Sequence, residues 1–132
     1  MSLIDLANAL HALAPSSIAT FQGEAPGGAV APWLVTNLES PRHIEAEAVT
    51  LSTGVYTWRV TITGSTSAQV LGFLGDVIEA WQGARVDVAG LAVGSLRGPD
   101  VTGPYLAGLT ATDTDLRYQV AQVRFSLTVT TT

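Results

Sequence analysis

The chain has 132 residues and a mass of 13.7 kDa, a length that suits one domain and is too short for two separate cores. It has no cysteine, which excludes thiol catalysis, thiolate metal sites and disulfides. Six basic residues, all arginine, stand against eleven acidic ones, and this net charge of -5 argues against a surface that binds nucleic acid. Only 13% of the residues are charged and the mean hydropathy is +0.34, which predicts that part of the surface is buried against other copies or partners.

The first thirteen residues lack the cationic start and the unbroken apolar core of a secretory signal. No apolar run approaches the roughly 18 residues that would span a bilayer, so we expect a protein made in the cytoplasm with no membrane partner. Leucines at positions 3, 6, 10 and 13 form one helical stripe and predict a helix over 3–14. Pro15 ends it.

Five segments of the first half show patterns typical of strands and loops. We expect a short strand at 17–21, a Gly/Pro loop at 23–32 and a buried strand at 33–38. Residues 43–51 alternate at period two and fit either a strand or an extended arm. The clearest strand is 55–63, with four apolar side chains on one face: Tyr56, Trp58, Val60 and Ile62.

The strongest periodic signal predicts a second helix over 67–82, preceded by a Ser/Thr cap at 65–67 and closed by Gly83. Phe73 lies at the boundary of its apolar stripe, where a partner would cover it. Beyond the helix we expect short strands at 85–88 and 91–96, a loop at the glycines and prolines of 98–104, and a long half-buried strand at 116–130.

This order of elements predicts an α+β fold, a two-layer sandwich with two helices on one face of a mostly antiparallel or mixed sheet. The chain reads as a single domain over 1–132 with a flexible loop or arm at about 39–52.

The sequence contains few residues that suit catalysis. Its two histidines, His11 and His43, have no serine motif beside them and are interpreted as solvated or hydrogen-bonded polar residues. His43, Glu45 and Glu47 share a strand face and suggest a metal site, but a solvated face or acidic arm explains them as well. We therefore predict no enzyme activity, no cofactor and no metal.

Two further groups of residues have a functional and a structural interpretation. Asp76 and Glu79 lie three residues apart on the second helix, where paired carboxylates can do acid–base work or simply carry solubilising charge. Four aromatic residues can line a ligand pocket, but the period of each element places them inward as core: Trp33, Tyr56, Trp58 and Trp81.

From Pro32 onward, about three quarters of the chain resembles the tail terminator (tail completion) proteins of long-tailed bacteriophages and related tail-like particles. The resemblance rests on the order and length of several features. After an amphipathic first helix these are the Pro-Trp-led strand at 32–35, the polar arm at 39–49, the strand at 55–63, the helix introduced by 65–67, and the passage 113–120 before the last strand.

The resemblance implies a virion assembly protein without catalytic residues. Such a protein closes into a ring, usually a homohexamer, on the head-proximal end of the tail tube, ends tube polymerisation and joins tail to head. Its partners are then further copies of itself, the major tail tube protein and a head-completion or neck protein, while DNA only passes through the lumen. It is made in the host cytoplasm and resides in the virion.

Within that frame we expect the 39–50 arm and the 99–110 loop to contact neighbouring subunits, with arginines as donors to neighbouring carboxylates. The candidate interface residues are Arg42, His43, Glu45, Glu47, Arg59, Phe73, Arg97, Asp100, Tyr105 and Arg117. Three alternatives remain open at this point: a head-closure protein, a tail tube protein, and a small ligand-binding α+β module with a tryptophan-lined pocket.

Overall fold

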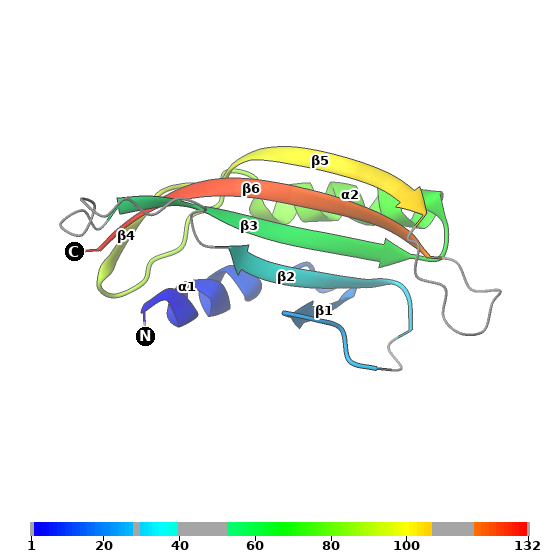
Figure 1. Cartoon of the computed structure of the whole chain (residues 1–132), viewed down its shortest axis with the longest axis horizontal. Helices are drawn as coiled ribbons and strands as arrows, with labels where there is room; N and C mark the ends of the chain where they lie inside the picture. The colour runs from blue at the N-terminus through cyan, green and yellow to red at the C-terminus, as the bar shows by residue number, and fades with distance from the viewer. Residues whose placement is uncertain (1, 28–29, 40–52, 107–117, 132) are drawn as a thin grey trace.

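The computed structural model describes residues 2–27, 30–39, 53–106 and 118–131 (Figure 1). Two helices and six strands follow one another along these segments. They are α1 (Ser2–His11), β1 (Ala19–Gln22), β2 (Trp33–Glu39), β3 (Thr53–Gly64), α2 (Ser67–Trp81), β4 (Leu91–Val93), β5 (Arg97–Leu106) and β6 (Gln119–Thr131).

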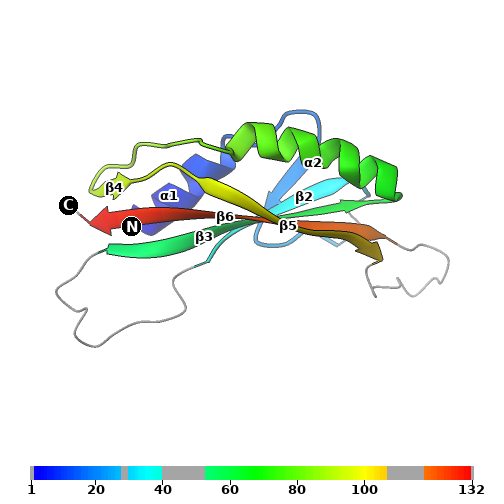
Figure 2. The same cartoon turned by 90° about the horizontal axis from the view of Figure 1, so that it is seen from above.

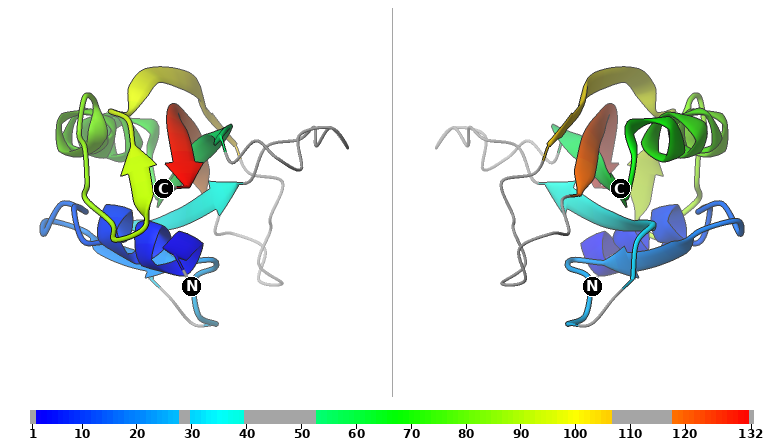
Figure 3. Two further views of the ribbon diagram at one scale, coloured as in Figure 1. Left: turned by 90° about the vertical axis from the view of Figure 1, so that its left-hand side faces the viewer. Right: turned by 90° about the vertical axis from the view of Figure 1, so that its right-hand side faces the viewer.

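All six strands belong to one curled, mixed sheet, and the predicted α+β class is confirmed. The order is β1-β2-β3-β6-β4, and β5 pairs with the same side of β6 as β4 does. The β1–β2 pair is parallel and the others are antiparallel. Both helices lie on the same side of the sheet (Figures 2 and 3), while β1 and β5 lie at opposite edges (Figure 1).

The core lies between the helices and the face of the sheet that β3 and β6 turn toward them. Alternation along each strand sends every second side chain inward, as the sequence predicts for 55–63. Trp58 of β3 and Trp81 of α2 are fully buried with ring centroids 6.0 Å apart. The Trp81 Nε1–H donates to the backbone oxygen of Leu10 at 2.9 Å, which ties α2 to α1.

The ends of α2 follow the predicted signals. The Thr66 hydroxyl accepts a hydrogen bond from the Gln69 backbone N–H and caps the helix, whose first residue is Ser67. At the other end Gly83 has a φ of +72°, a conformation that glycine adopts without steric cost. The first helix is shorter than predicted: α1 ends at His11, and turn-like hydrogen bonds to Leu10 and His11 carry the chain to Ala14.

Two predictions for the segment after α2 are wrong. Residues 97–106, which include the predicted Gly/Pro loop, form the strand β5. The predicted strand at 85–88 is instead irregular, with a single isolated bridge from Val88 to Leu91, and β4 stops at Val93. Strand β5 exists because it pairs with β6 and absorbs each Gly-Pro pair in a shift of register, the usual place for proline in a sheet.

Trp33 is also misplaced by the prediction. It aligns with Thr63, whereas its neighbour Leu34 aligns with buried Ile62, so Trp33 belongs to the face of the sheet away from the helices. Trp33 packs there edge-on against Tyr118, with ring centroids 5.5 Å apart. We call this the outer face, and it includes Trp33, Val35, Asn37, Thr57, Arg59, Thr61, Thr63, Gln122, Arg124 and Ser126.

Candidate functional site

The ten candidate interface residues divide into those that the structure describes and those that it does not. Five lie outside the described residues: Arg42, His43, Glu45, Glu47 and Arg117. The expected 39–50 arm lies there too, except for Glu39, and so does the end of the expected 99–110 loop. The interface predictions for those residues stay predictions.

Arg59 and Phe73 lie apart from the other candidates. Arg59 occupies the outer face, where its Nη1 lies 3.1 Å from the Glu39 carboxylate, and both side chains are partly exposed. Such a pair adds little to stability. Phe73 is half-buried against the core on α2.

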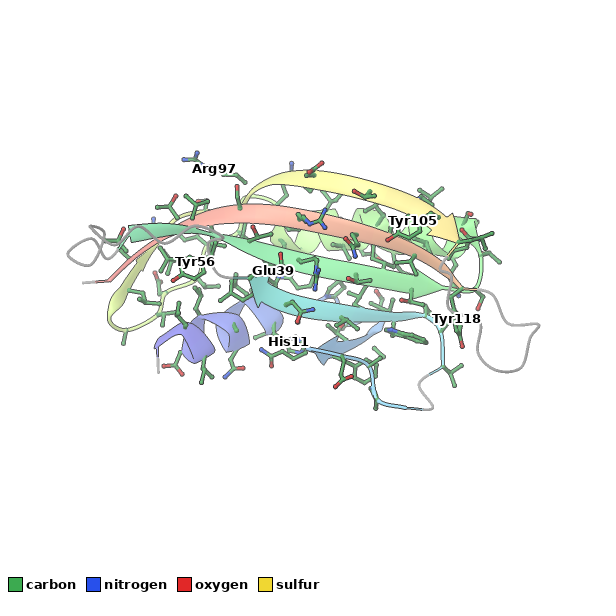
Figure 4. The ribbon with its side chains drawn as sticks, viewed as in Figure 1. His11, Glu39, Tyr56, Arg97, Tyr105 and Tyr118 are labelled. Carbon is green, nitrogen blue, oxygen red and sulfur yellow. The ribbon has the colours of Figure 1, made fainter. Side chains whose placement is uncertain are left out.

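Strand β5 carries the remaining three candidates, Arg97, Asp100 and Tyr105. All three are exposed, and Arg97 points away from the sheet at the start of β5 while Tyr105 lies at the far end (Figure 4). Asp100 aligns with Arg124 of β6, a residue that the sequence analysis did not single out. The long alternation of β6 shows that Arg124 faces away from the core, but only the pairing with β5 shows what lies beside it.

A shallow hollow of about 340 Å³ opens where β5 meets β6. Its charged and hydroxyl-bearing lining comes from Thr57, Arg97, Asp100, Arg124 and Ser126. Arg124 donates from Nη2 to the Gln122 side-chain oxygen at 2.9 Å, and Arg97 makes no hydrogen bond or ion pair with a described residue. Two guanidinium groups therefore line the hollow, and both have N–H groups that donate no hydrogen bond to a described residue.

The same strand exposes apolar side chains. Tyr105 is 42% exposed and Leu106 is 53% exposed, and Val101 is exposed between them and Arg97. Leu71 of α2 is 52% exposed, and it shares a helix flank with Gln82, which donates through Nε2 to the backbone oxygen of Gly98. We call Arg97, Val101, Tyr105 and Leu106, together with Leu71, the β5 edge.

The backbone of β5 is irregular at two places. From Arg97 to Asp100, and again from Thr102 to Tyr105, three steps along β5 correspond to two along β6. Gly103 lies in the second shift with a φ of +101°, and a Cβ added there would meet the Val120 backbone oxygen at 2.7 Å. Prolines at 99 and 104 lack the N–H that a further strand would need, so this edge is poorly suited to extending the sheet and better suited to side-chain contacts.

A second hollow lies in the helix layer, between α2 and the segment that joins α1 to β1. It measures about 420 Å³, and we call it the acidic groove; it is lined by Pro15, Ser16, Ser17, Asp76, Glu79 and Ala80. The Ser17 hydroxyl donates to the Asp76 carboxylate at 3.3 Å, whereas Glu79 makes no hydrogen bond to a described residue. Both carboxylates are exposed to solvent, as the charge-carrying interpretation of this pair predicts.

The other chemical candidates lie apart from one another. The His11 ring nitrogen Nδ1 lies 2.8 Å from the Thr36 hydroxyl, so this histidine is hydrogen-bonded, one of the two states predicted for it. Trp58 and Trp81 are fully buried, as their interpretation as core residues predicts, with tilted rings. Within the described segments no three His, Asp or Glu side chains gather into a potential metal site, and none of the helices there has the length and apolar character to cross a membrane.

In comparisons with known proteins, no family model matches this chain and no curated protein matches it. The case for a function therefore depends on the residues themselves. The structure brings three of the predicted interface residues onto one exposed strand, and it places an acidic groove in the helix layer on the other flank of α2.

Proposed function

We propose that this protein is a structural assembly protein of a phage tail that closes into a ring, with six copies as the expected number. The ring caps the head-proximal end of the tail tube, ends tube polymerisation and offers a joining surface to the head. The protein works by fitting against copies of itself and against its neighbours, with no bond made or broken.

The observation that carries the proposal is the β5 edge. It presents three exposed large apolar side chains on a single sheet edge, with a fourth, Leu71, beside it on α2. Val101 aligns with buried Val123 on the side of the sheet that faces the helices, whereas Tyr105 aligns with Val120 on the outer face. Apolar groups exposed on both sides of an edge strand suit a partner that covers the edge itself. The low charged fraction of the whole chain points in the same direction.

The two edges of the sheet differ. One edge is β1, four residues long and parallel to its neighbour, and the other is β5, ten residues long, antiparallel and interrupted by two register shifts. Such unlike edges suit a head-to-tail contact between different surfaces. Repeated head-to-tail contacts close into a ring when their rotation allows it and form a filament otherwise.

The resemblance to tail terminators supports the choice of this assembly. Of the features behind that resemblance, the structure describes the first helix, the strand that begins at Trp33, the strand over 55–63, the second helix and the last strand, whereas most of 39–49 and of 113–120 lies outside the described residues. The tail tube protein and a head-completion protein then contact opposite faces of the ring, and DNA passes through its lumen. The net charge of -5 suits a lumen to which DNA does not adhere.

The decisive experiment removes the protein from the particle. Phage that lack the gene should produce tails of uncontrolled length without joined heads, and the gene supplied in trans should restore normal length. Electron microscopy of the lysates measures both. Tails of normal length without the protein contradict the proposal, and purified protein that polymerises into filaments on its own supports a tail tube protein instead.

A further inference from the structure

The charges of the described residues are distributed unevenly across the molecule. On α1, α2 and the described part of the β1–β2 connection the charged residues are Asp5, Glu24, Asp76 and Glu79, with no arginine among them. Three of the four described arginines, Arg85, Arg97 and Arg124, lie in the half of the chain that forms β4, β5 and β6. The helix layer is therefore acidic. The half of the chain that forms β4, β5 and β6 holds these three arginines and two carboxylates, Asp87 and Asp100, so its described charge is net positive by one, and Asp100 lines the same hollow as Arg97 and Arg124.

The charged side chains at the β5–β6 hollow and at the acidic groove have few partners among the described residues. Arg97 has no polar partner among the described residues, and Arg124 has a neutral one, Gln122. In the acidic groove Asp76 accepts from a neutral hydroxyl and Glu79 accepts from no described residue. Two arginines and two carboxylates, at two surfaces of the same chain, thus form no ion pair with any residue that the structure describes.

These surfaces lie on opposite flanks of α2. Leu71 and Gln82 belong to the flank that meets β5, as the hydrogen bond from Gln82 to Gly98 shows. Asp76 belongs to the flank that meets Ser17. One copy therefore cannot bring its own β5 edge into its own acidic groove, but a neighbouring copy can.

From this charge complementarity we infer that, in the ring of the proposed function, the β5 edge of each copy docks in the acidic groove of the next. Arg97 and Arg124 donate to the carboxylates of Asp76 and Glu79, for which a guanidinium fork is well matched. The exposed apolar side chains of the β5 edge are covered in the same contact. Because every copy carries one surface of each kind, the contact repeats head-to-tail.

Two charge-reversed variants test the inference. The first, Asp76→Arg with Glu79→Arg, has a basic groove beside its basic β5 edge; the second, Arg97→Glu with Arg124→Glu, has an acidic edge beside its acidic groove. Each variant alone should associate roughly a hundredfold more weakly than the wild type, because like charges meet at every contact. Mixed in equal amounts, the two should assemble, since each contact again joins opposite charges.

The mixture also reports the number of copies. Only an alternating ring satisfies every contact, so native mass spectrometry with one variant isotopically labelled should show equal numbers of both variants. Asp5→Arg with Glu24→Arg makes the same charge change outside the groove and should associate as the wild type does. If the double variant does not fold, Arg97→Glu alone takes its place: it alters an exposed residue that has no hydrogen bond or ion pair with a described residue, and it should also weaken association.

Sedimentation of the wild type and the variants, up to millimolar concentration, separates the outcomes. Variants that associate like the wild type, a mixture that does not recover, or a wild type that stays monomeric all overturn the inference. The proposed function has its own test in tail length. A ring that forms through another surface and still controls tail length would therefore contradict this docking arrangement and leave the proposed function intact.

Discussion

Strand β6 has two very different sides. Toward β3 it pairs in unbroken register, from Thr53 opposite Thr130 to Gly64 opposite Gln119, and the inward side chains of both strands are the core. Toward β5 the register shifts twice, and most of β5 is exposed. The comparison teaches that one strand supports two different arrangements: its regular side pairs with β3 around the core, and its irregular side carries the exposed strand β5 that we propose as a docking surface.

The largest difference between the two sides should be in stability. Trp58→Ala removes a fully buried indole from β3 and should lower the free energy of unfolding by about 3–5 kcal/mol. Tyr105→Ala on β5 should lower it by less than about 1 kcal/mol, because this ring is 42% exposed. Chemical denaturation followed by circular dichroism measures both. An equal decrease in the free energy of unfolding for both variants would contradict the conclusion that the β3 side of β6 contributes more to stability than the β5 side.

A backbone substitution tests how firmly β5 depends on its second register shift. Gly103→Ala places a methyl group 2.7 Å from the Val120 backbone oxygen at a φ of +101°, and it should cost about 1–3 kcal/mol. Gly27→Ala, where a Cβ meets nothing within 4 Å, is the matched control and should change stability little. A Gly103→Ala variant with the same free energy of unfolding as the Gly27→Ala control would contradict the second register shift of β5.

The smallest predicted effect is local. Gln82→Ala removes the side-chain hydrogen bond to the Gly98 oxygen, which links α2 to the start of β5 and contributes about 0.5–1.5 kcal/mol. Amide hydrogen exchange should accelerate several-fold in β5 and remain unchanged in β3. Asn8→Ala, at an exposed residue of α1 with no side-chain hydrogen bond to a described residue, should leave both strands unchanged.

The sequence predicts the regular side of β6 well and the irregular side poorly. Alternation along 55–63 and 116–130 identifies the inward side chains, because the buried face of such a strand is occupied mostly by apolar residues and the other face by polar ones. Between 98 and 104 the two Gly-Pro pairs look the same whether they make a loop or a register shift in an edge strand. A strand forms here because β6 is available to pair with it, and β6 lies too far along the chain for the local sequence of 98–104 to indicate that pairing.

The candidate site shows the same limit. Asp100 and Tyr105 belong to the predicted 99–110 loop and Arg97 is predicted as an interface donor, whereas in the structure all three lie on one strand. The neighbour Arg124 and the groove at Asp76 were not predicted as surfaces, because the sequence does not say which residues lie beside them. Trp33 was placed on the wrong face because an apolar residue at a strand start fits either side.

The position of β6 also affects how the protein is made. Three strands, β3, β4 and β5, share β6 as a neighbour, and all three precede it in the chain. During translation they leave the ribosome before that neighbour exists, so their unpaired backbone stays open to other nascent chains or to chaperones. Folded copies can accumulate only after β6 has emerged, so the assembly that we propose would begin only once each copy has been translated through β6.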